Sequence, residues 1–243
     1  MSPFISVITV VRNGAGTLEK TIASVLSQTY DRFEYIVIDG ASSDGTLDIL
    51  RKYDDRLKWI SEPDSGIYEA MNKGLDLARG QWVYFLGADD YLAGPDVLKM
   101  VAPCLNGRLS LVFGSVRYTD GRLVASELGA RTLLRNTLHH QGAFYNARLF
   151  ETWRYDCNFK VVADYELNLL IYRRGQPYTR IAETIAVCGD LGLSLTRWRM
   201  AVAETNAIRG KHMGGGVTRL LGLIRGLEML GSRLLIAWRQ RKE

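Results

Sequence analysis

Two adjacent carboxylates, Asp89 and Asp90, come directly after the apolar run Trp82–Leu86 in the stretch WVYFLGADD. The run predicts a buried strand, and two like charges at its end are costly unless something positive offsets them. Hard divalent cations such as Mg²⁺ and Mn²⁺ take oxygen ligands and keep waters or substrate phosphates in their shell. The pair therefore predicts a metal site, with a helix N-cap or an exposed loop as the alternative.

Polar residues also follow other expected strands, where the sequence reads Arg12-Asn13-Gly14, Asp39-Gly40 and Glu62-Pro63-Asp64. In open α/β sheets, ligands bind outside the carboxyl ends of the strands. Asp39 is therefore expected either to accept hydrogen bonds from a base or ribose, or to stabilise the turn that follows it.

The elements that must position these residues follow from hydrophobic periodicity. Strands are expected at residues 4–11, 33–40, 58–63 and 81–86, with an amphipathic helix in each interval. This alternation is typical of a parallel sheet with right-handed crossovers. Beyond residue 95 we expect a helix at 96–105, a strand at 109–118, a hairpin at Asp120-Gly121, a helix at 164–175 and a strand at 178–188. This second half reads as mixed sheet built onto the first without a linker.

Composition excludes several classes of function. The 243 residues are 47% hydrophobic and 23% charged, with a net charge of +5. Residues 216–243 carry six basic and two acidic side chains, so the remaining body is close to neutral, which argues against a nucleic-acid-binding surface. No G-x-G-x-x-G or P-loop glycine pattern occurs. Three cysteines without a Cys-x-x-Cys pair and the lack of a basic leader predict a cytoplasmic protein.

Residues 6–46 and 62–90 together resemble the family 2 glycosyltransferases, in particular those of bacterial surface polysaccharides such as O-antigen and colanic acid. The resemblance extends over about residues 4–190. It implies an α/β GT-A fold, a nucleotide-sugar-binding mixed sheet flanked by helices. The expected division is a GT-A domain at 1–213, with a nucleotide-sugar half to about 95 and an acceptor half from about 96, and a basic amphipathic helix at 214–243.

The resemblance also assigns roles in the first half. The end of the first strand would hold the nucleotide through Thr9, Val11 and Arg12, with Asp39 facing the base. Asp89 and Asp90 stand where the family has its Asp-x-Asp-type motif, and would bind the ribose and a Mn²⁺ or Mg²⁺ ion. Because the chain reads Ala-Asp-Asp there, Asp90 is the preferred metal ligand.

Two further donor contacts are implied at Asn72 and Lys73. For Lys73, an i,i+4 ion pair with Glu69 on an exposed helix face is the alternative.

In the second half, the resemblance places the catalytic base at Asp164, although Ala163 replaces the first acid of the Glu-Asp pair that many members have. A plain N-cap role for Asp164 is the alternative. His140 and Gln141 would lie beside the acceptor, unless the histidine is structural. His212 would approach the metal or the diphosphate from a flexible loop.

These roles imply an inverting transfer from a UDP- or GDP-sugar to a glycan acceptor, expected to be linked to a polyprenyl carrier. A metal at Asp90 would stabilise the leaving diphosphate while Asp164 deprotonates the attacking hydroxyl. Two alternatives remain, a sugar nucleotidyltransferase and an inactive scaffold with the same fold. The first would need a better glycine-rich, basic N-terminal loop than VRNGAGTLEK.

On a helical wheel, the apolar residues of the last thirty fall on one arc with most arginines opposite. The arc comprises Val217, Leu220, Leu223, Ile224, Leu227, Leu230, Leu234, Leu235 and Trp238. The longest unbroken apolar run is too short to span a bilayer. The pattern favours an interfacial helix on anionic lipid at the inner face of the membrane, with packing on the protein body or a partner subunit as the alternative.

Overall fold

The four apolar runs of the first ninety residues form four parallel strands: β1 (Ile5–Val11), β2 (Phe33–Asp39), β3 (Lys58–Ser61) and β4 (Trp82–Phe85). They lie in the order β3-β2-β1-β4. The helices between them are α1 (Leu18–Leu26), α2 (Thr46–Arg51) and α3 (Ile67–Leu77). The predicted alternation of strands and helices is confirmed.

The computed structural model describes residues 4–189 and 196–223. After β4 these residues form shorter and more varied elements. They are β5 (Tyr91–Leu92), α4 (Val97–Val101), η1 (Ala102–Cys104), β6 (Leu111–Tyr118), β7 (Leu123–Ala125), η2 (Ala130–Leu133), η3 (His140–Gly142), β8 (Ala143–Asn146), α5 (Leu149–Thr152), α6 (Ala163–Arg173), β9 (Tyr178–Cys188) and α8 (Trp198–Met213). The predicted hairpin is the antiparallel pair β6–β7, with Gly121 at a φ of 90° in its turn.

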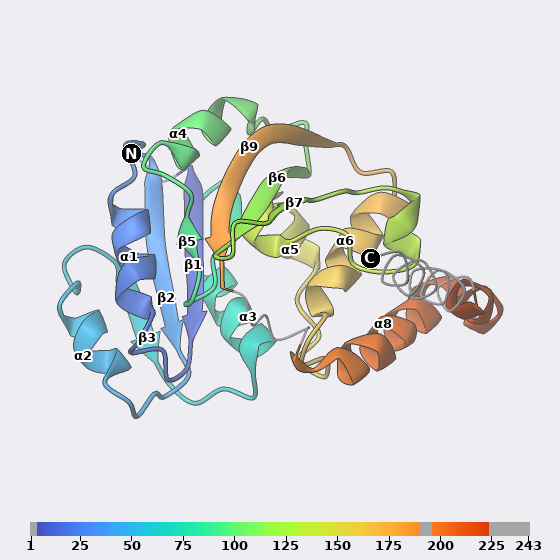
Figure 1. Ribbon diagram of the computed structural model, residues 1–243, viewed down its shortest axis with the longest axis horizontal. Helices are drawn as coiled ribbons and strands as arrows, with labels where there is room; N and C mark the ends of the chain where they lie inside the picture. The colour runs from blue at the N-terminus through green and yellow to red at the C-terminus, as the bar shows by residue number, and fades with distance from the viewer. Residues whose placement is uncertain (1–3, 190–195, 224–243) are drawn as a thin grey trace, which may run out of the picture.

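One mixed sheet joins the two halves (Figure 1). The joining strand is β8, which pairs antiparallel with both β4 and β6. Strand β9 then runs parallel to β6, and the full order is β3-β2-β1-β4-β8-β6-β9-β5. The predicted α/β class, a mixed sheet flanked by helices, is therefore confirmed.

Helices cover both faces of this sheet. On one face, α1, α2 and α4 bury residues such as Ile22, Leu50 and Leu98 against the strands. On the other face, α3, α5 and α6 do the same with residues such as Met71 and Phe150. These two cores fix the carboxyl ends of β1, β2 and β4 along one edge of the sheet.

The structure corrects one expectation at the C-terminus. His212 lies in the last turn of α8 and not in a loop, because the helix continues to Met213 and ends only at Gly214, whose φ is 80°. Residues 215–223 are helical as predicted, with Val217, Leu220 and Leu223 exposed. The rest of the predicted apolar arc, from Ile224 to Trp238, lies outside the described residues. Within residues 4–189 and 196–223, no helix has the length and apolar character needed to cross a bilayer.

Candidate active site

The turn after β4 buries one carboxylate of the acidic pair and exposes the other. Asp90 is 3% exposed, whereas Asp89 is an exposed residue. Asp90 Oδ1 accepts a hydrogen bond from the Gly189 backbone N–H, and Oδ2 accepts one from the Gln141 side chain, both at 3.0 Å. Because the short strand β5 follows, neither aspartate is a helix N-cap.

Burial raises the pKa of Asp90, and the neighbouring charge of Asp89 raises it further. No lysine or arginine within residues 4–189 or 196–223 forms an ion pair with either carboxylate. Gly87 gives the Asp90 carboxylate its space, because a Cβ at residue 87 would lie 2.4 Å from Asp90 Oδ2. The pair is thus an acidic site in which Asp90 is held by hydrogen bonds, and neither carboxylate pairs with a lysine or arginine of the described part of the chain.

A cavity of about 800 Å³ opens beside this turn and brings several predicted residues together. Its lining includes Asp89, Asp90, His140, Gln141 and Asp164. These residues come from the β4–β5 turn, from η3 and from α6, which are far apart in the sequence. The structure therefore places the expected metal ligands and the expected base around one space.

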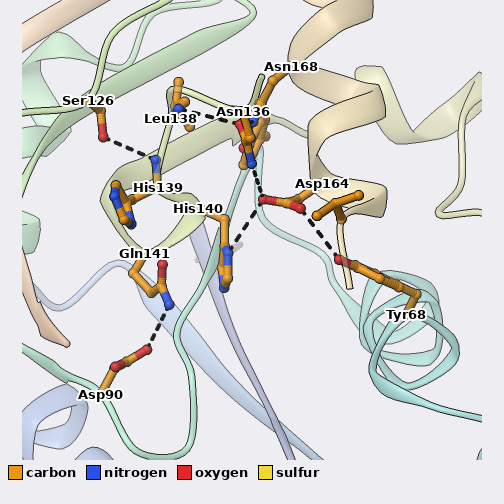
Figure 2. Close-up of polar contacts among 12 residues, drawn as sticks. Tyr68, Asp90, Ser126, Asn136, Leu138, His139, His140, Gln141, Asp164 and Asn168 are labelled. Carbon is orange, nitrogen blue, oxygen red and sulfur yellow. Dashed lines mark hydrogen bonds and ion pairs between the residues drawn. The ribbon is translucent and has the colours of Figure 1, made fainter. Parts of the chain in front are cut away.

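Asp164 lies on the opposite wall of the cavity, in the first turn of α6 (Figure 2). It is 8% exposed, and its Oδ2 accepts a hydrogen bond of 2.7 Å from Asn136. Its Oδ1 accepts a longer one, 3.4 Å, from the Tyr68 hydroxyl on α3. Because Val162 is the N-cap residue of α6, the N-cap alternative for Asp164 is wrong.

His140 lies between the two acidic walls (Figure 2), with its Nδ1 3.8 Å from Asp164 Oδ2. Burial lowers the pKa of His140, but the Asp164 carboxylate and the charges of Asp90 and Asp89 outweigh burial, so that the net shift is upward. His139 shows the opposite behaviour, since burial and the neighbouring His140 lower its pKa. The two histidines are therefore not equivalent, and His140 is the one that offsets acidic charge in the cavity.

The nucleotide-side residues lie at the ends of β1 and β2, where Val11 and Asp39 are register partners. Asp39 is fully buried and accepts hydrogen bonds from the Ser42 backbone N–H, the Ser42 hydroxyl and the Ser61 hydroxyl. These contacts match the turn-stabilising alternative. Thr9 is also fully buried and bonds to the Tyr35 hydroxyl, while Arg12 is exposed. The side chains of Thr9 and Asp39 thus face the interior of the sheet edge.

Two loops at this edge are cross-linked to each other. The Ser43 N–H donates to Asn13 Oδ1 at 2.9 Å, and the Asn13 N–H donates to the Ser42 hydroxyl at 2.7 Å. The Ala15 N–H donates to the Asp44 carboxylate at 3.0 Å. Asn13 and Ala41 both adopt a positive φ, near 55°, which is uncommon for residues other than glycine. The β1–α1 and β2–α2 loops therefore form one hydrogen-bonded unit.

Asn72 and Lys73 do not line the cavity. Lys73 pairs with Glu62 at 2.8 Å and with Glu69 at 3.2 Å, as its alternative anticipated. Asn72 bonds through its side chain to the backbone N–H and C=O of Tyr155. The structure therefore places both on α3 in contacts that link neighbouring segments.

Sequence reasoning missed the residues that orient the two acids. Asn136 contacts Asp164 and receives a hydrogen bond from Asn168, which in turn accepts one from Tyr145. Gly189 contacts Asp90 through its backbone. A polar Asn168 inside the apolar stretch ELNLLI was a usable signal, because a fully buried amide needs hydrogen-bond partners. The roles of Asn136 and Gly189 had no local signal.

Comparison with known proteins decides the family. The family model for glycosyl transferase family 2 matches residues 6–165, which include both acidic walls of the cavity. This chain belongs to that family. A Mycobacterium bovis protein named as a PGL/p-HBAD biosynthesis glycosyltransferase is 31% identical over 259 aligned positions, covering 99% of each chain. Membership makes the chain a glycosyltransferase and removes the sugar nucleotidyltransferase alternative.

Solved structures of glycosyltransferases share its GT-A fold. S. aureus TarS, residues 1–349 with UDP-GlcNAc, superimposes with a TM-score of 0.64 at 17% identity, covering 86% of this chain and 71% of that one. The mannosyltransferase PcManGT from Pyrobaculum calidifontis, with GDP-Man and Mn²⁺, also gives 0.64, at 20% identity, covering 86% and 63%. At these identities the likeness concerns the fold.

The acidic pair fits a divalent cation by its donor chemistry. Asp89 and Asp90 offer hard carboxylate oxygens, and the exposed Asp89 leaves the site open to further ligands. Among the residues that the structure describes, no group of three or more His, Cys, Asp or Glu side chains could hold a metal ion. Mg²⁺ or Mn²⁺ at this place would therefore complete its shell with waters and substrate phosphates, as these ions usually do.

Proposed function

We propose that this glycosyltransferase moves a sugar from a UDP- or GDP-sugar to a glycan acceptor, in a single inverting and metal-dependent step. The observation that carries the proposal is the pair of acidic walls around one cavity, with Asp89 and Asp90 on one side and Asp164 on the other. One wall suits a cation-bound diphosphate, and the other suits a general base.

The residues of the chain would divide the work as follows. Asp90 and Asp89 would hold a Mn²⁺ or Mg²⁺ ion, which would offset the negative charge of the diphosphate leaving group. Asp164 would take the proton from the acceptor hydroxyl as its oxygen bonds to the anomeric carbon and the bond to the diphosphate oxygen breaks. Attack from the face opposite the diphosphate inverts the anomeric configuration, and no bond between sugar and enzyme is formed.

The donor and the metal are supported by the ligands named for the neighbours in fold, UDP-GlcNAc for TarS and GDP-Man with Mn²⁺ for PcManGT. A lipid-linked acceptor in cell-surface glycan synthesis is supported by the basic, amphipathic C-terminal segment. This segment would bring the enzyme to the inner face of the membrane as a peripheral protein. His140 and Gln141 would border the acceptor, between the two acidic walls.

The decisive experiment measures which product the enzyme releases. Release of UDP or GDP with incorporation of the sugar into a polyprenyl-linked acceptor is expected, and the proton NMR coupling of the product should show the inverted linkage. Thermal-shift measurements with UDP and GDP, with and without Mn²⁺, should show stabilisation that requires the metal, because a ligand that binds only the folded state raises its stability. A stabilisation that EDTA leaves intact would contradict the metal-dependent part.

Membrane attachment has a separate test with the full chain. Co-sedimentation with anionic phosphatidylglycerol vesicles is expected, and it should weaken with salt and with neutral vesicles. An Arg219→Gln/Arg225→Gln variant should bind these vesicles more weakly. Equal binding to neutral vesicles would contradict an electrostatic interfacial helix.

A further inference from the structure

One face of helix α8 makes three contacts with the N-terminal part of α6 and with the residues just before it. The contacting residues follow each other at intervals of three or four, so they lie on the same side of the helix. They are Glu204, Ile208, Lys211 and His212. Each contacts a segment next to Asp164. Figure 1 shows α8 packed alongside the lower end of α6.

The first contact is a carboxylate that holds the backbone ahead of α6. Glu204 Oε1 accepts a hydrogen bond of 2.7 Å from the Lys160 N–H. Its Oε2 accepts bonds from the N–H groups of Val161 at 2.9 Å and Val162 at 3.0 Å. Val162 is the N-cap of α6 and has no side-chain oxygen with which to cap the helix. In a capping box, an acidic residue of the same helix accepts the N–H of the N-cap residue. Here Glu204, from a different helix, accepts that N–H and places a negative charge at the start of α6.

The second and third contacts fix α8 along α6. Ile208 is fully buried in a small apolar cluster with Val161, Val162, Tyr165 and Leu169. One turn further on, the Glu166 carboxylate, 2% exposed, meets Lys211 Nζ at 2.9 Å and His212 Nε2 at 2.5 Å. A buried carboxylate needs such partners, since an unpaired buried charge is costly. The register of α8 against α6 is therefore set at both ends.

Asp164 lies between these contacts. It comes two residues after Val162, which Glu204 holds, and two residues before Glu166, which Lys211 and His212 hold. Its carboxylate is further oriented by Asn136, on the cavity side. The family match ends at residue 165, so α8 lies beyond the matched part of the chain.

From this geometry we infer that Glu204 is a positioning residue, and that α8 sets the place of the catalytic base Asp164 by holding residues 160–162. The inference rests on the proposed function, because it takes Asp164 as the base. Glu204 is not among the residues that line the cavity, whereas Val161 and Val162, whose N–H groups it binds, are. Its hydrogen bonds reach Asp164 through the backbone that leads into α6.

The test compares Glu204→Gln with Glu151→Gln, the same chemical change on an exposed residue of α5. The glutamine side chain keeps one oxygen acceptor but has an NH₂ group in place of the second. That NH₂ group cannot accept a hydrogen bond from the backbone N–H groups that face it. A displacement of the base by about 1 Å can lower the rate by up to about 100-fold, so kcat per folded molecule should fall by about 10- to 100-fold. The KM for the donor and the thermal shift with UDP or GDP should stay unchanged. Glu151→Gln should match the wild type in all of these.

A second variant separates positioning from simple stabilisation. Ile208→Ala removes apolar packing between α8 and α6 but keeps the Glu204 carboxylate. Well below its melting temperature it should retain far more kcat than Glu204→Gln, even where it is the less stable of the two. If the two variants lose kcat only in proportion to their unfolded fractions, the inference is overturned.

Hydrogen exchange tests the contact without any substrate. The amides of residues 160–162 should exchange faster in Glu204→Gln than in the wild type, with no change in the β1–α1 loop. Wild-type exchange at 160–162, or wild-type kcat in the variant, overturns the inference. A wild-type enzyme that releases neither UDP nor GDP contradicts the proposed function instead, and the exchange result still decides whether Glu204 holds this backbone.

Discussion

The N-terminal half, to about residue 95, and the C-terminal half, for which we propose donor and acceptor roles, build their acidic walls by different means. Asp90 stands at the end of a parallel strand, in a turn closed by the Asp90 N–H and the Gly87 C=O at 3.1 Å. Asp164 stands on a helix whose start is held by distant residues. Yet each acid is oriented by the other half, since Gln141 and Gly189 contact Asp90 while Tyr68 contacts Asp164. The cavity is therefore complete only when the two halves are packed together.

The largest effect is expected from Asp164→Asn, which keeps the shape of this wall but removes the proposed base. General-base catalysis contributes about 10²- to 10⁴-fold, so kcat should fall by that factor while the KM for the donor stays unchanged. Steady-state kinetics with saturating Mn²⁺ measure both. A variant with full kcat would place the base at another residue.

The next effect concerns the donor wall, through Gly87→Ala. The new Cβ would lie 2.4 Å from Asp90 Oδ2, so the carboxylate must move. Because a shift of about 1 Å can cost about 100-fold, we expect kcat to fall by up to that factor and the metal-dependent thermal shift with UDP or GDP to shrink. Gly94→Ala is the matched control, because a Cβ there has nothing within 4 Å. Equal activity of the two variants would contradict a role for the Asp90 position.

A smaller effect should follow from Gln141→Ala, which tests the contact from the acceptor half to the donor wall. The variant removes one of the two hydrogen bonds to the Asp90 side chain. Loss of a residue that orients a metal ligand typically costs about 10- to 100-fold in metal affinity, so the Mn²⁺ concentration for half-maximal activity should rise by at least about 10-fold. Titration of activity with Mn²⁺ measures this. An unchanged midpoint would show that Gly189 alone orients the carboxylate.

The smallest effect is expected inside the donor half, at Glu34. Its Oε1 accepts bonds from the Ser6 hydroxyl and the Arg79 N–H, and its Oε2 pairs with Lys58. Burial raises the pKa of Glu34. The hydrogen bonds from Lys58, Ser6 and Arg79 outweigh burial, so the net shift of the pKa is downward. Glu34→Gln should lower the free energy of unfolding by about 1 kcal/mol at neutral pH and leave kcat unchanged.

The pH dependence of this last effect has a definite sign. A carboxyl whose pKa is lowered on folding contributes stability that is present above its unfolded pKa and is lost as pH falls through the folded pKa. The difference between wild type and Glu34→Gln in urea unfolding should therefore vanish in acid. A difference that persists below the lowered pKa would mean that shape, and not charge, is responsible.

The same contrast explains what the sequence could predict. In the first half, strand and helix periodicity and the polar residues at strand ends gave the four parallel strands and the place of Asp89 and Asp90. These features are local, because each strand ends where its apolar run ends. In the second half, three elements also had local sequence signals and were predicted. They are the hairpin at Gly121, the helix around Asp164 and the strand at 178–188.

The contacts that finish the cavity were not local. Asn136 and Asp164 are 28 residues apart, and Tyr68 and Asp164 are 96 apart, so no spacing rule links them. Helix α8 was missed because its hydrophobic pattern is weak, and the face that contacts α6 carries Lys211 and His212 beside the single buried apolar residue Ile208. The side chains of Asp39 and Thr9 make hydrogen bonds inside the sheet edge, and their expected contact with a nucleotide stays a prediction.

The cross-linked loops at the ends of β1 and β2 constrain how this enzyme could be re-engineered. Asn13 binds Ser42 and Ser43, and Asp44 binds Ala15, so neither loop has a conformation of its own. Exchanging only one of the loops for that of a relative would break these hydrogen bonds and leave backbone N–H groups unpaired. A graft between members of the family should therefore keep this edge of the sheet intact only when residues 12–16 and 41–46 are transplanted together.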